Sequence, residues 1–252
     1  MPRTWKSLVV CSMVGGLLSL AGCNSGSEGN AEANVAATGA AGGESGGSGG
    51  VGAGEDTPGA LGAGSVGSGL SDPAPAAPPP TVVIDTSLGA ITIELDKEKA
   101  PVTVNEFLKY VESGFYDGTI FHQVWKGAVI LGGSFTEDLT EKPAGTPILN
   151  EATNGLKNLR GTIAMAREPN VINSATCQFF INVMDNPNYD YQPGAEQSLN
   201  AENYGYCVFG RVTEESMAVV DKIADVEVRD QPPDFERIPV QTVLIKSVRK
   251  VR

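Results

Sequence analysis

TIFHQVWKGAVILGGSF, residues 119–135, is the stretch that decides the fold. It contains two runs with strand character, IFHQVW and AVILGG, joined at Lys126 and Gly127. Gly132 and Gly133 let the backbone turn or approach another segment closely, because glycine has no Cβ. The stretch also holds His122, the only histidine in the chain. A second run, QFFIN at 178–182, has the same mixture of aromatic and amide side chains, and we expect the two runs to form one wall of a binding groove.

Around this stretch the apolar pattern predicts short strands and two helices. Further strands are predicted over residues 81–86, 90–96, 161–166, 178–183, 206–212 and 240–248. One helix is expected from Pro101 to Gly114, and a second from about Glu214 with Thr213 as its N-cap. About eight strands that do not alternate with helices predict a mainly β fold, a closed eight-stranded antiparallel barrel capped by two α-helices.

The N-terminal residues read as a targeting segment. Two basic residues precede an apolar run at residues 8–20, which is too short to span a bilayer comfortably. The run ends in LAGC, residues 20–23, which resembles the lipobox of bacterial lipoproteins. The resemblance implies a signal peptide over residues 1–22 and a lipidated Cys23 that carries palmitate-type acyl chains. Asn24, rather than Asp, follows the cysteine, and this implies anchoring in the outer membrane of the bacterial cell envelope, facing the periplasm. The alternative is an ordinary cleaved signal peptide with a cysteine there by chance.

Residues 24–80 are mostly Gly, Ala and Ser, and they end in PAPAAPPP at 73–80. Such a segment buries too little apolar area to offset the entropy of ordering it. We therefore expect residues 23–80 to be a lipidated, disordered linker and residues 81–252 to form a single domain.

The composition excludes several kinds of partner and cofactor. The formal charge of −12 argues against nucleic acid as a ligand. One histidine and four cysteines without a Cys-x-x-Cys pair cannot supply a zinc ligand set, so no metal or other cofactor is expected. We also expect a monomer. Cys177 and Cys207 both fall in predicted strands, and they are either a disulfide or two buried thiols.

Five segments stand in an order that resembles the cyclophilin family of peptidyl-prolyl cis–trans isomerases: FLKYVESGFYDGTIFHQV, GGSF, LNEATNGLKNLRGTIAMAR, SATCQFFINV and YGYCVFGRV. Together they cover nearly all of residues 81–252 and are most similar to compact bacterial members. The resemblance implies an eight-stranded barrel with two helices, in agreement with the pattern of strands. It also implies isomerisation of X-Pro peptide bonds.

The family's catalytic groove is matched at three positions. His122 stands at the family's histidine, and Gln178 and Phe180 stand at the residues for the substrate backbone and the proline ring. Phe179 lies between these two and should point into the barrel, because successive side chains of a strand alternate.

Four positions depart from the family. The arginine that supplies the key hydrogen-bond donor is replaced by Gln123. The phenylalanine and methionine that floor the proline slot are replaced by Ala128 and Val129. The glutamine that braces the arginine is replaced by Leu131. The resemblance therefore implies an isomerase with weakened activity.

Further substrate-binding positions are predicted at the rim. The resemblance places Ala166, Arg167, Tyr189 and Tyr206 there, although the tyrosines could instead cover the barrel. Arg167 is not expected to replace the missing arginine, because bacterial members carry arginine there as well.

Rotation about an X-Pro bond is opposed by amide resonance, with a barrier near 18–20 kcal/mol. A catalyst needs no base or metal, because it has only to hold the proline and stabilise the twisted amide. Two hypotheses follow. The first is an envelope-anchored isomerase acting on exported, unfolded proteins, and the alternative is a non-catalytic module that binds proline peptides on a tether.

Overall fold

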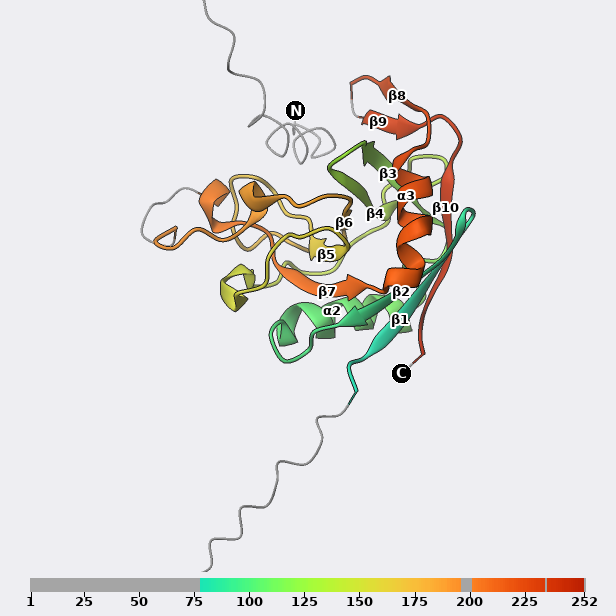
Figure 1. Cartoon of the computed structure of the whole chain (residues 1–252). Coiled ribbons are helices and arrows are strands. Elements are labelled where there is room, and N and C mark those ends of the chain that lie inside the picture. The colour runs from blue at the N-terminus through green and yellow to red at the C-terminus, as the bar shows by residue number, and fades with distance from the viewer. Residues whose placement is uncertain (1–77, 196–200, 234, 252) are drawn as a thin grey trace, which may run out of the picture. The chain divides into compact units, whose positions relative to one another are not determined.

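A computed structural model describes residues 78–195, 201–233 and 235–251. The predicted signal peptide, Cys23 and most of the predicted linker lie outside these ranges. The main elements, drawn in Figure 1, are β1 Thr81–Thr86, β2 Gly89–Leu95, α2 Pro101–Glu112, β3 Thr119–Trp125, β4 Val129–Thr136, β5 Thr162–Met165, β6 Phe179–Asn182, β7 Val208–Val212, α3 Met217–Ala224, β8 Val228–Gln231, β9 Phe235–Pro239 and β10 Val243–Lys250. Short 3-10 turns lie at Ala152–Asn154, Pro187–Tyr189, Ala201–Tyr204 and Glu214–Ser216.

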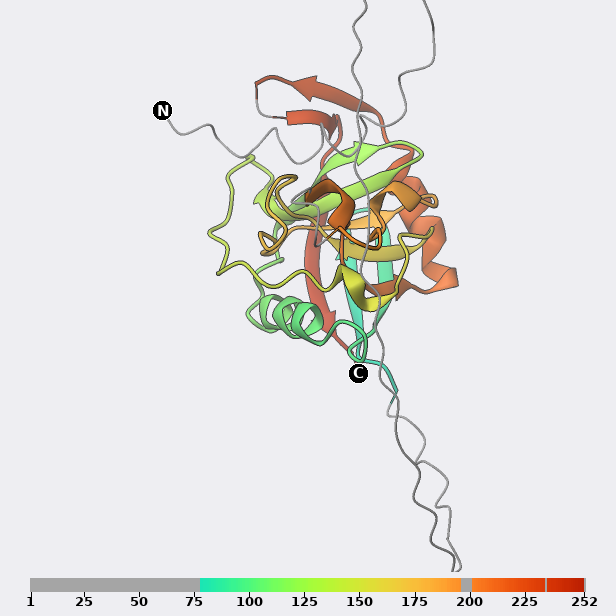
Figure 2. The same cartoon turned by 90° about the vertical axis from the view of Figure 1, so that its left-hand side faces the viewer.

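Eight strands close into a barrel in the order β1-β10-β3-β4-β6-β5-β7-β2, and every neighbouring pair is antiparallel. Strands β8 and β9 form a separate hairpin outside the ring. Figures 1 and 2 show α2 and α3 against different sides of the barrel, with the hairpin projecting beyond it. The predicted mainly β fold, a closed eight-stranded barrel with two helices, is confirmed.

The barrel interior is filled by one side-chain row from each strand. Val124, Ile130, Ile181 and Ile163 face one another in register across β3, β4, β6 and β5, and each is at most 1 % exposed. Branched aliphatic side chains pack well on a pleated surface, which explains their use in these strands. This inner row fixes which residues of the same strands must point outward.

Helix α2 closes the core through one aromatic side chain. The ring of Phe107 lies 5.3 Å from that of Tyr116, 5.9 Å from that of Phe179 and 5.1 Å from that of Phe209. Phe179 thus points into the barrel, as the alternation predicted. The helix begins at Pro101, where a missing N–H costs nothing.

The start of the second helix differs from the prediction. Residues Glu214–Ser216 form a 3-10 turn, and α3 begins at Met217. Thr213 is extended but its side chain makes no capping bond to a backbone N–H. Its hydroxyl lies 3.2 Å from the Ser216 hydroxyl instead. Thr213 therefore occupies the N-cap position of the 3-10 turn, but its side chain does not form the capping bond, because a neighbouring hydroxyl takes the place of the backbone N–H.

The β8–β9 hairpin was not predicted. Two adjacent prolines, Pro232 and Pro233, lie between its strands, and proline usually ends a strand pattern. The other strands are found where they were predicted, with ends that differ by at most three residues. The last strand, for example, begins at Val243 rather than at residue 240.

The two glycines of the opening stretch allow a close approach, as predicted. Gly133 has φ +101°, and a Cβ there would lie 2.9 Å from the Phe179 ring and 3.0 Å from the Cys177 carbonyl oxygen. A Cβ at Gly132 would lie 3.0 Å from the Ile120 carbonyl oxygen. The register of β3 and β4 shifts at this point, so the strand pair bends around the packed Phe179.

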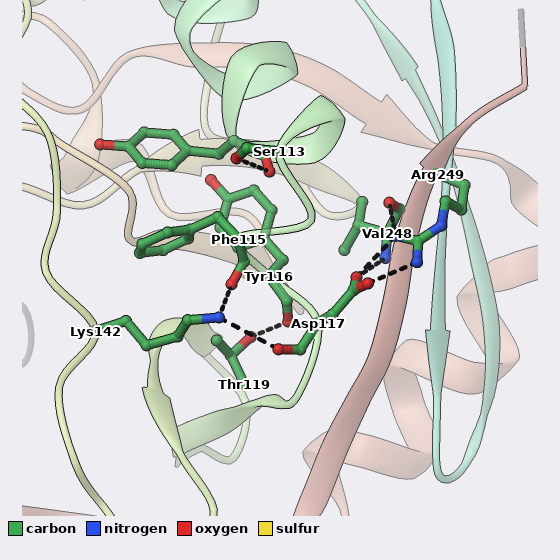
Figure 3. A network of polar contacts seen from close by, with 9 residues as sticks. Ser113, Phe115, Tyr116, Asp117, Thr119, Lys142, Val248 and Arg249 are labelled. Atoms are coloured by element: carbon green, nitrogen blue, oxygen red, sulfur yellow. Dashed lines mark hydrogen bonds and ion pairs between the residues drawn. The ribbon is translucent and has the colours of Figure 1, made fainter.

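Polar contacts hold the segment that leads into β3 (Figure 3). The carboxylate of Asp117 pairs with the Arg249 guanidinium at 2.6 and 2.8 Å and accepts the Val248 backbone N–H at 3.2 Å. The Arg249 hydrogen bond is the main reason that the pKa of Asp117 lies below its ordinary value. On the other side, the Lys142 ammonium donates to the carbonyl oxygens of Phe115 and Asp117. The start of β3 is thus tied to β10, which fixes where the site residues of β3 begin.

Cys177 and Cys207 are free, buried thiols. The disulfide alternative is therefore wrong, and the alternative of two buried small side chains is correct. Burial raises the pKa of Cys177 to about 11 and that of Cys207 to about 12, so both stay protonated. None of the helices in the described ranges has the length and apolar character needed to cross a membrane.

Candidate active site

One row of outward-facing residues runs across five strands of the barrel. Gln123 of β3 stands opposite Leu131 of β4, which stands opposite Phe180 of β6. Phe180 stands opposite Ala164 of β5, which stands opposite Val208 of β7. Residues so paired have Cβ atoms about 5 Å apart. Two predicted departures from the family, Gln123 and Leu131, are therefore direct cross-strand neighbours.

The row belongs to a second apolar cluster, separate from the barrel interior. We call it the outer cluster. Its members are Val129, Leu131, Ala164, Ala166, Phe180, Tyr189, Tyr206 and Val208, with Trp125 and Leu156 packed at its edge. The predicted site residues Val129, Leu131, Ala166, Phe180, Tyr189 and Tyr206 are thus brought together in one place.

Phe180 is the centre of the outer cluster. Its ring lies 5.9 Å from that of Tyr189 and 5.5 Å from that of Tyr206, and both pairs are edge-to-face. The two tyrosine rings also contact each other at 5.5 Å. Edge-to-face pairs are favourable beyond their area burial. Both tyrosines therefore pack on the outer face, and neither belongs to the core inside the barrel.

Gln178 immediately precedes β6 and lies beside the residue that follows the end of β5. The Ala166 N–H donates to the Gln178 carbonyl oxygen at 2.9 Å, so the two residues are held side by side beyond the ends of β5 and β6. Gln178 lies two residues before Phe180 and shares its outward face. The residue is 6 % exposed. The pair adds amide groups next to the apolar cluster.

His122 lies at the irregularity in the β3–β4 register between Phe121 and Gln123. It is 3 % exposed, and its ring packs edge-on against Phe135 at 4.7 Å. Among the described residues no hydrogen-bond partner reaches its Nδ1. Burial lowers the pKa of His122 from 6.5 to about 3, while a hydrogen bond with the Ile120 backbone opposes the shift. The imidazole is therefore neutral at physiological pH.

A neutral His122 predicts two pH dependences. The rate of the isomerisation expected from the sequence should show no step near pH 6.5. Stability should fall as the pH drops below 6.5, because the unfolded chain then binds a proton that the folded chain does not bind until about pH 3. The slope approaches about 1.4 kcal/mol per pH unit. Urea unfolding of the protein and of His122→Gln between pH 7.5 and 5 measures it. An equal slope in both proteins would contradict the assignment.

Arg167 is a structural residue of the surrounding loops. It is 2 % exposed, and its guanidinium donates to the carbonyl oxygens of Gly205, Glu168, Pro169 and Ala201. Its Cζ also lies 4.8 Å from the centroid of the Tyr206 ring. These hydrogen bonds to main-chain carbonyl oxygens fix the guanidinium in place, and there it packs against the Tyr206 ring.

Ala128 is the predicted site residue that lies apart from the outer cluster. It belongs to the turn between β3 and β4, where its N–H donates to the Trp125 carbonyl oxygen at 2.9 Å. Its own carbonyl accepts the Val183 N–H at 2.8 Å. Sequence reasoning missed Ala164, Val208 and Leu156 as members of this cluster. The spacing of Ala164 and Ala166 in a predicted strand was the available signal.

Residues 81–250 match the family described as "Cyclophilin type peptidyl-prolyl cis-trans isomerase/CLD". The chain belongs to the cyclophilin family. Peptidyl-prolyl cis-trans isomerase A of Dickeya dadantii (strain 3937) is 44 % identical over 171 residues, which cover 68 % of this chain and 84 % of that protein. Peptidyl-prolyl cis-trans isomerase B of Escherichia coli (strain K12) is 46 % identical over 167 residues, which cover 66 % of this chain and 97 % of that protein.

A solved structure gives the same fold. This cyclophilin superposes on a Cryptosporidium parvum cyclophilin type peptidyl-prolyl cis-trans isomerase, crystallised in the presence of the dipeptide Ala-Pro, with a TM-score of 0.52 and 26 % identity. The match covers 68 % of this chain and 99 % of that one. The cyclophilin described here is thus a peptidyl-prolyl cis-trans isomerase. The roles of its individual site residues stay predictions from the sequence.

Proposed function

We propose that this cyclophilin isomerises X-Pro bonds of exported proteins with an activity weakened by the side chain at position 123. The observation that carries the proposal is the cross-strand row in which Gln123 stands opposite Leu131. In the family, by resemblance, these positions hold an arginine and the glutamine that braces it. Here both members of that pair are uncharged, and Leu131 has no polar atom to orient its neighbour.

The chemistry follows from the outer cluster. The substrate proline packs against Phe180, and the amide of Gln178 holds the substrate backbone. When the X-Pro bond twists, its nitrogen regains a lone pair that can accept a hydrogen bond. A donor aimed at that nitrogen stabilises the twisted state more than the planar one, and this difference is the source of catalysis.

Gln123 can donate from its side-chain amide, but the donor is neutral. Hydrogen bonds from a charged donor are roughly twice as strong as neutral ones. Losing one preorganised donor typically lowers a rate by about 10²–10³-fold. Arg167 offers no substitute, because its guanidinium donates to four backbone carbonyl oxygens. These two facts support reduced activity.

A second candidate function is a binding module for proline peptides without catalysis. The joint replacement at Gln123 and Leu131 favours it, because the donor and its brace are lost together while the apolar cluster around Phe180 is kept. A binding module needs the apolar slot only. A weak isomerase needs the slot and one aimed donor.

Two measurements on the same protein decide between these functions. The first is the cis-to-trans rate of a proline tetrapeptide, measured beside the Escherichia coli relative under identical conditions. The second is the affinity for the same peptide by calorimetry. We expect acceleration over the spontaneous rate, with kcat/KM about 10²-fold below the relative. Binding without acceleration would contradict weak catalysis and establish the module.

We also propose that the protein is anchored to the outer membrane through lipid on Cys23 and reaches its substrates on the tether of residues 23–80. The support is the sequence LAGC after a short apolar run. Several acyl chains on one residue give stable anchoring. In a Gram-negative host the protein should sediment with outer membranes, and Cys23→Ser should abolish lipid labelling and outer-membrane sorting. Cys11→Ser is the matched control. Lipid labelling that persists in Cys23→Ser would contradict this anchor.

A further inference from the structure

The β8–β9 hairpin lies against β3, the strand that carries Gln123 (Figures 1 and 2). Phe235 and Ile238 of β9 form a small apolar cluster with Ile120 of β3 and Phe135 of β4. The rings of Phe135 and Phe235 are 5.2 Å apart. The hairpin is thus fixed to the edge of the candidate active site by buried side chains.

One arginine of the hairpin is aimed at the edge of that site. The Cζ atom of Arg237 lies 5.4 Å from the centroid of the Trp125 ring. Trp125 is half-buried at the edge of the outer cluster and lies two residues after Gln123, on the same side of β3. A guanidinium within about 6 Å of an indole face is attracted by the ring. Arg237 therefore stands beside the row that contains Gln123.

The backbone at Arg237 is shaped to place its side chain. Glu236 and Arg237 together stand opposite one residue, Asp230, so β9 carries a β-bulge. Arg237 has φ 54°, a conformation that a non-glycine residue seldom adopts. Its N–H donates to the Asp230 carboxylate at 2.9 Å, which holds the bulge. Bulges of this kind re-aim a side chain next to a functional site.

The guanidinium of Arg237 is exposed and has unused donors. Within the described part of the chain it forms no hydrogen bond or ion pair, and its contact is the Trp125 ring. By contrast, Arg160 pairs with Asp221 and Arg249 pairs with Asp117. Five N–H donors in a planar fork suit a carboxylate ligand. The site thus has a free cation at its rim, where the rest of the outer row is uncharged.

We propose that Arg237, held over Trp125, is a specificity residue of the isomerase that binds an acidic side chain of the substrate. The proposal rests on the assignment of the outer cluster as the proline site. Phe180 on β6 is two strands from β3, a distance of roughly 10 Å. An extended peptide covers that distance in about three residues. The acidic side chain therefore lies two or three positions from the proline.

The formal charge of −12 would by itself disfavour an acidic substrate, so a direct contact with a cation is needed to bind one. Distant acidic groups are screened beyond a Debye length of about 8 Å at physiological salt, whereas a direct carboxylate–guanidinium contact is not. The lysine nearest in sequence to Trp125 is Lys126, and it already pairs with Asp225 at 2.8 Å. Arg237 is thus the cation that an acidic substrate would meet at this edge.

The test uses proline peptides with one Glu placed two or three residues before or after the proline, each beside its Gln counterpart. For the full-length protein we expect at least one position where Glu raises kcat/KM, or peptide affinity by calorimetry, by about 2- to 5-fold. Arg237→Ala should erase the preference, and Arg237→Lys should keep part of it. Arg229→Ala removes a charge from the same hairpin and should change nothing.

Two outcomes overturn this proposal alone. One is equal Glu and Gln values at all four positions in the wild type, while neutral peptides are still bound or isomerised. The other is a preference that survives in Arg237→Ala. If neutral peptides are neither bound nor isomerised by the wild type, the proline site itself is wrong, and both proposals fall together.

Discussion

Gln123→Arg combined with Leu131→Gln is expected to raise kcat/KM for a proline tetrapeptide by about 10²-fold. The first change supplies a charged donor for the prolyl nitrogen, and the second supplies an amide next to it on β4. The two residues are cross-strand neighbours, so the new side chains meet without a change in the backbone. The measurement is the catalysed cis-to-trans rate over a range of enzyme concentrations.

The single variants are the controls for this result. Gln123→Arg alone should give a smaller gain, because the apolar Leu131 leaves the long arginine side chain free to adopt several rotamers. Leu131→Gln alone should give almost none. A double variant no faster than the wild type would show that the row from Gln123 to Phe180 does not hold the reacting bond.

Phe179→Ala is expected to lower the free energy of unfolding by about 3–5 kcal/mol. The Phe179 ring is completely buried and packs edge-to-face on Phe107, Tyr116 and Phe121. Removing it leaves a cavity in the centre of the barrel. Urea unfolding followed by tryptophan fluorescence measures the change.

Phe180→Ala is the matched variant one residue further on. Its ring is also completely buried, in the outer cluster, so we expect a similar loss of stability. At a temperature where the variant is folded, we also expect loss of the contact with the substrate proline and a fall in kcat/KM of about 10- to 200-fold. Phe179→Ala should leave kcat/KM nearly unchanged at a temperature where it is folded. If instead Phe179→Ala abolishes activity and Phe180→Ala does not, the two faces of β6 have been assigned the wrong way round.

The barrel could be predicted from the sequence because each of its strands has its own side-chain pattern. Alternation predicted that Phe179 points into the barrel. The register confirms this, because Ile181, two residues after Phe179 on β6, belongs to the inner row with Ile130. The outer members of the same strands follow from the same period of two. Ala164 was overlooked because an alanine in a strand gives little sign of the face that it occupies.

The hairpin could not be predicted, because its stabilising contacts are distant in sequence. Phe235 and Ile238 pack on Ile120 and Phe135, about one hundred residues earlier. In the local sequence, Pro232 and Pro233 indicate the end of a strand rather than a hairpin. The position of Arg237 over Trp125 depends on that long-range packing and on a bulge, and neither has a signature in a single sequence.

Strand β10 pairs with both β1 and β3, so the ring is sealed by a strand that lies more than one hundred residues after β3. Until residues near 250 are available, β1 and β3 each keep an unpaired edge, and the core lacks Val243, Ile245 and Val248. Unpaired edges of this kind invite association between chains. A nascent chain of this protein therefore stays open, and in need of protection from its neighbours, until residues Val243–Lys250 have been synthesised.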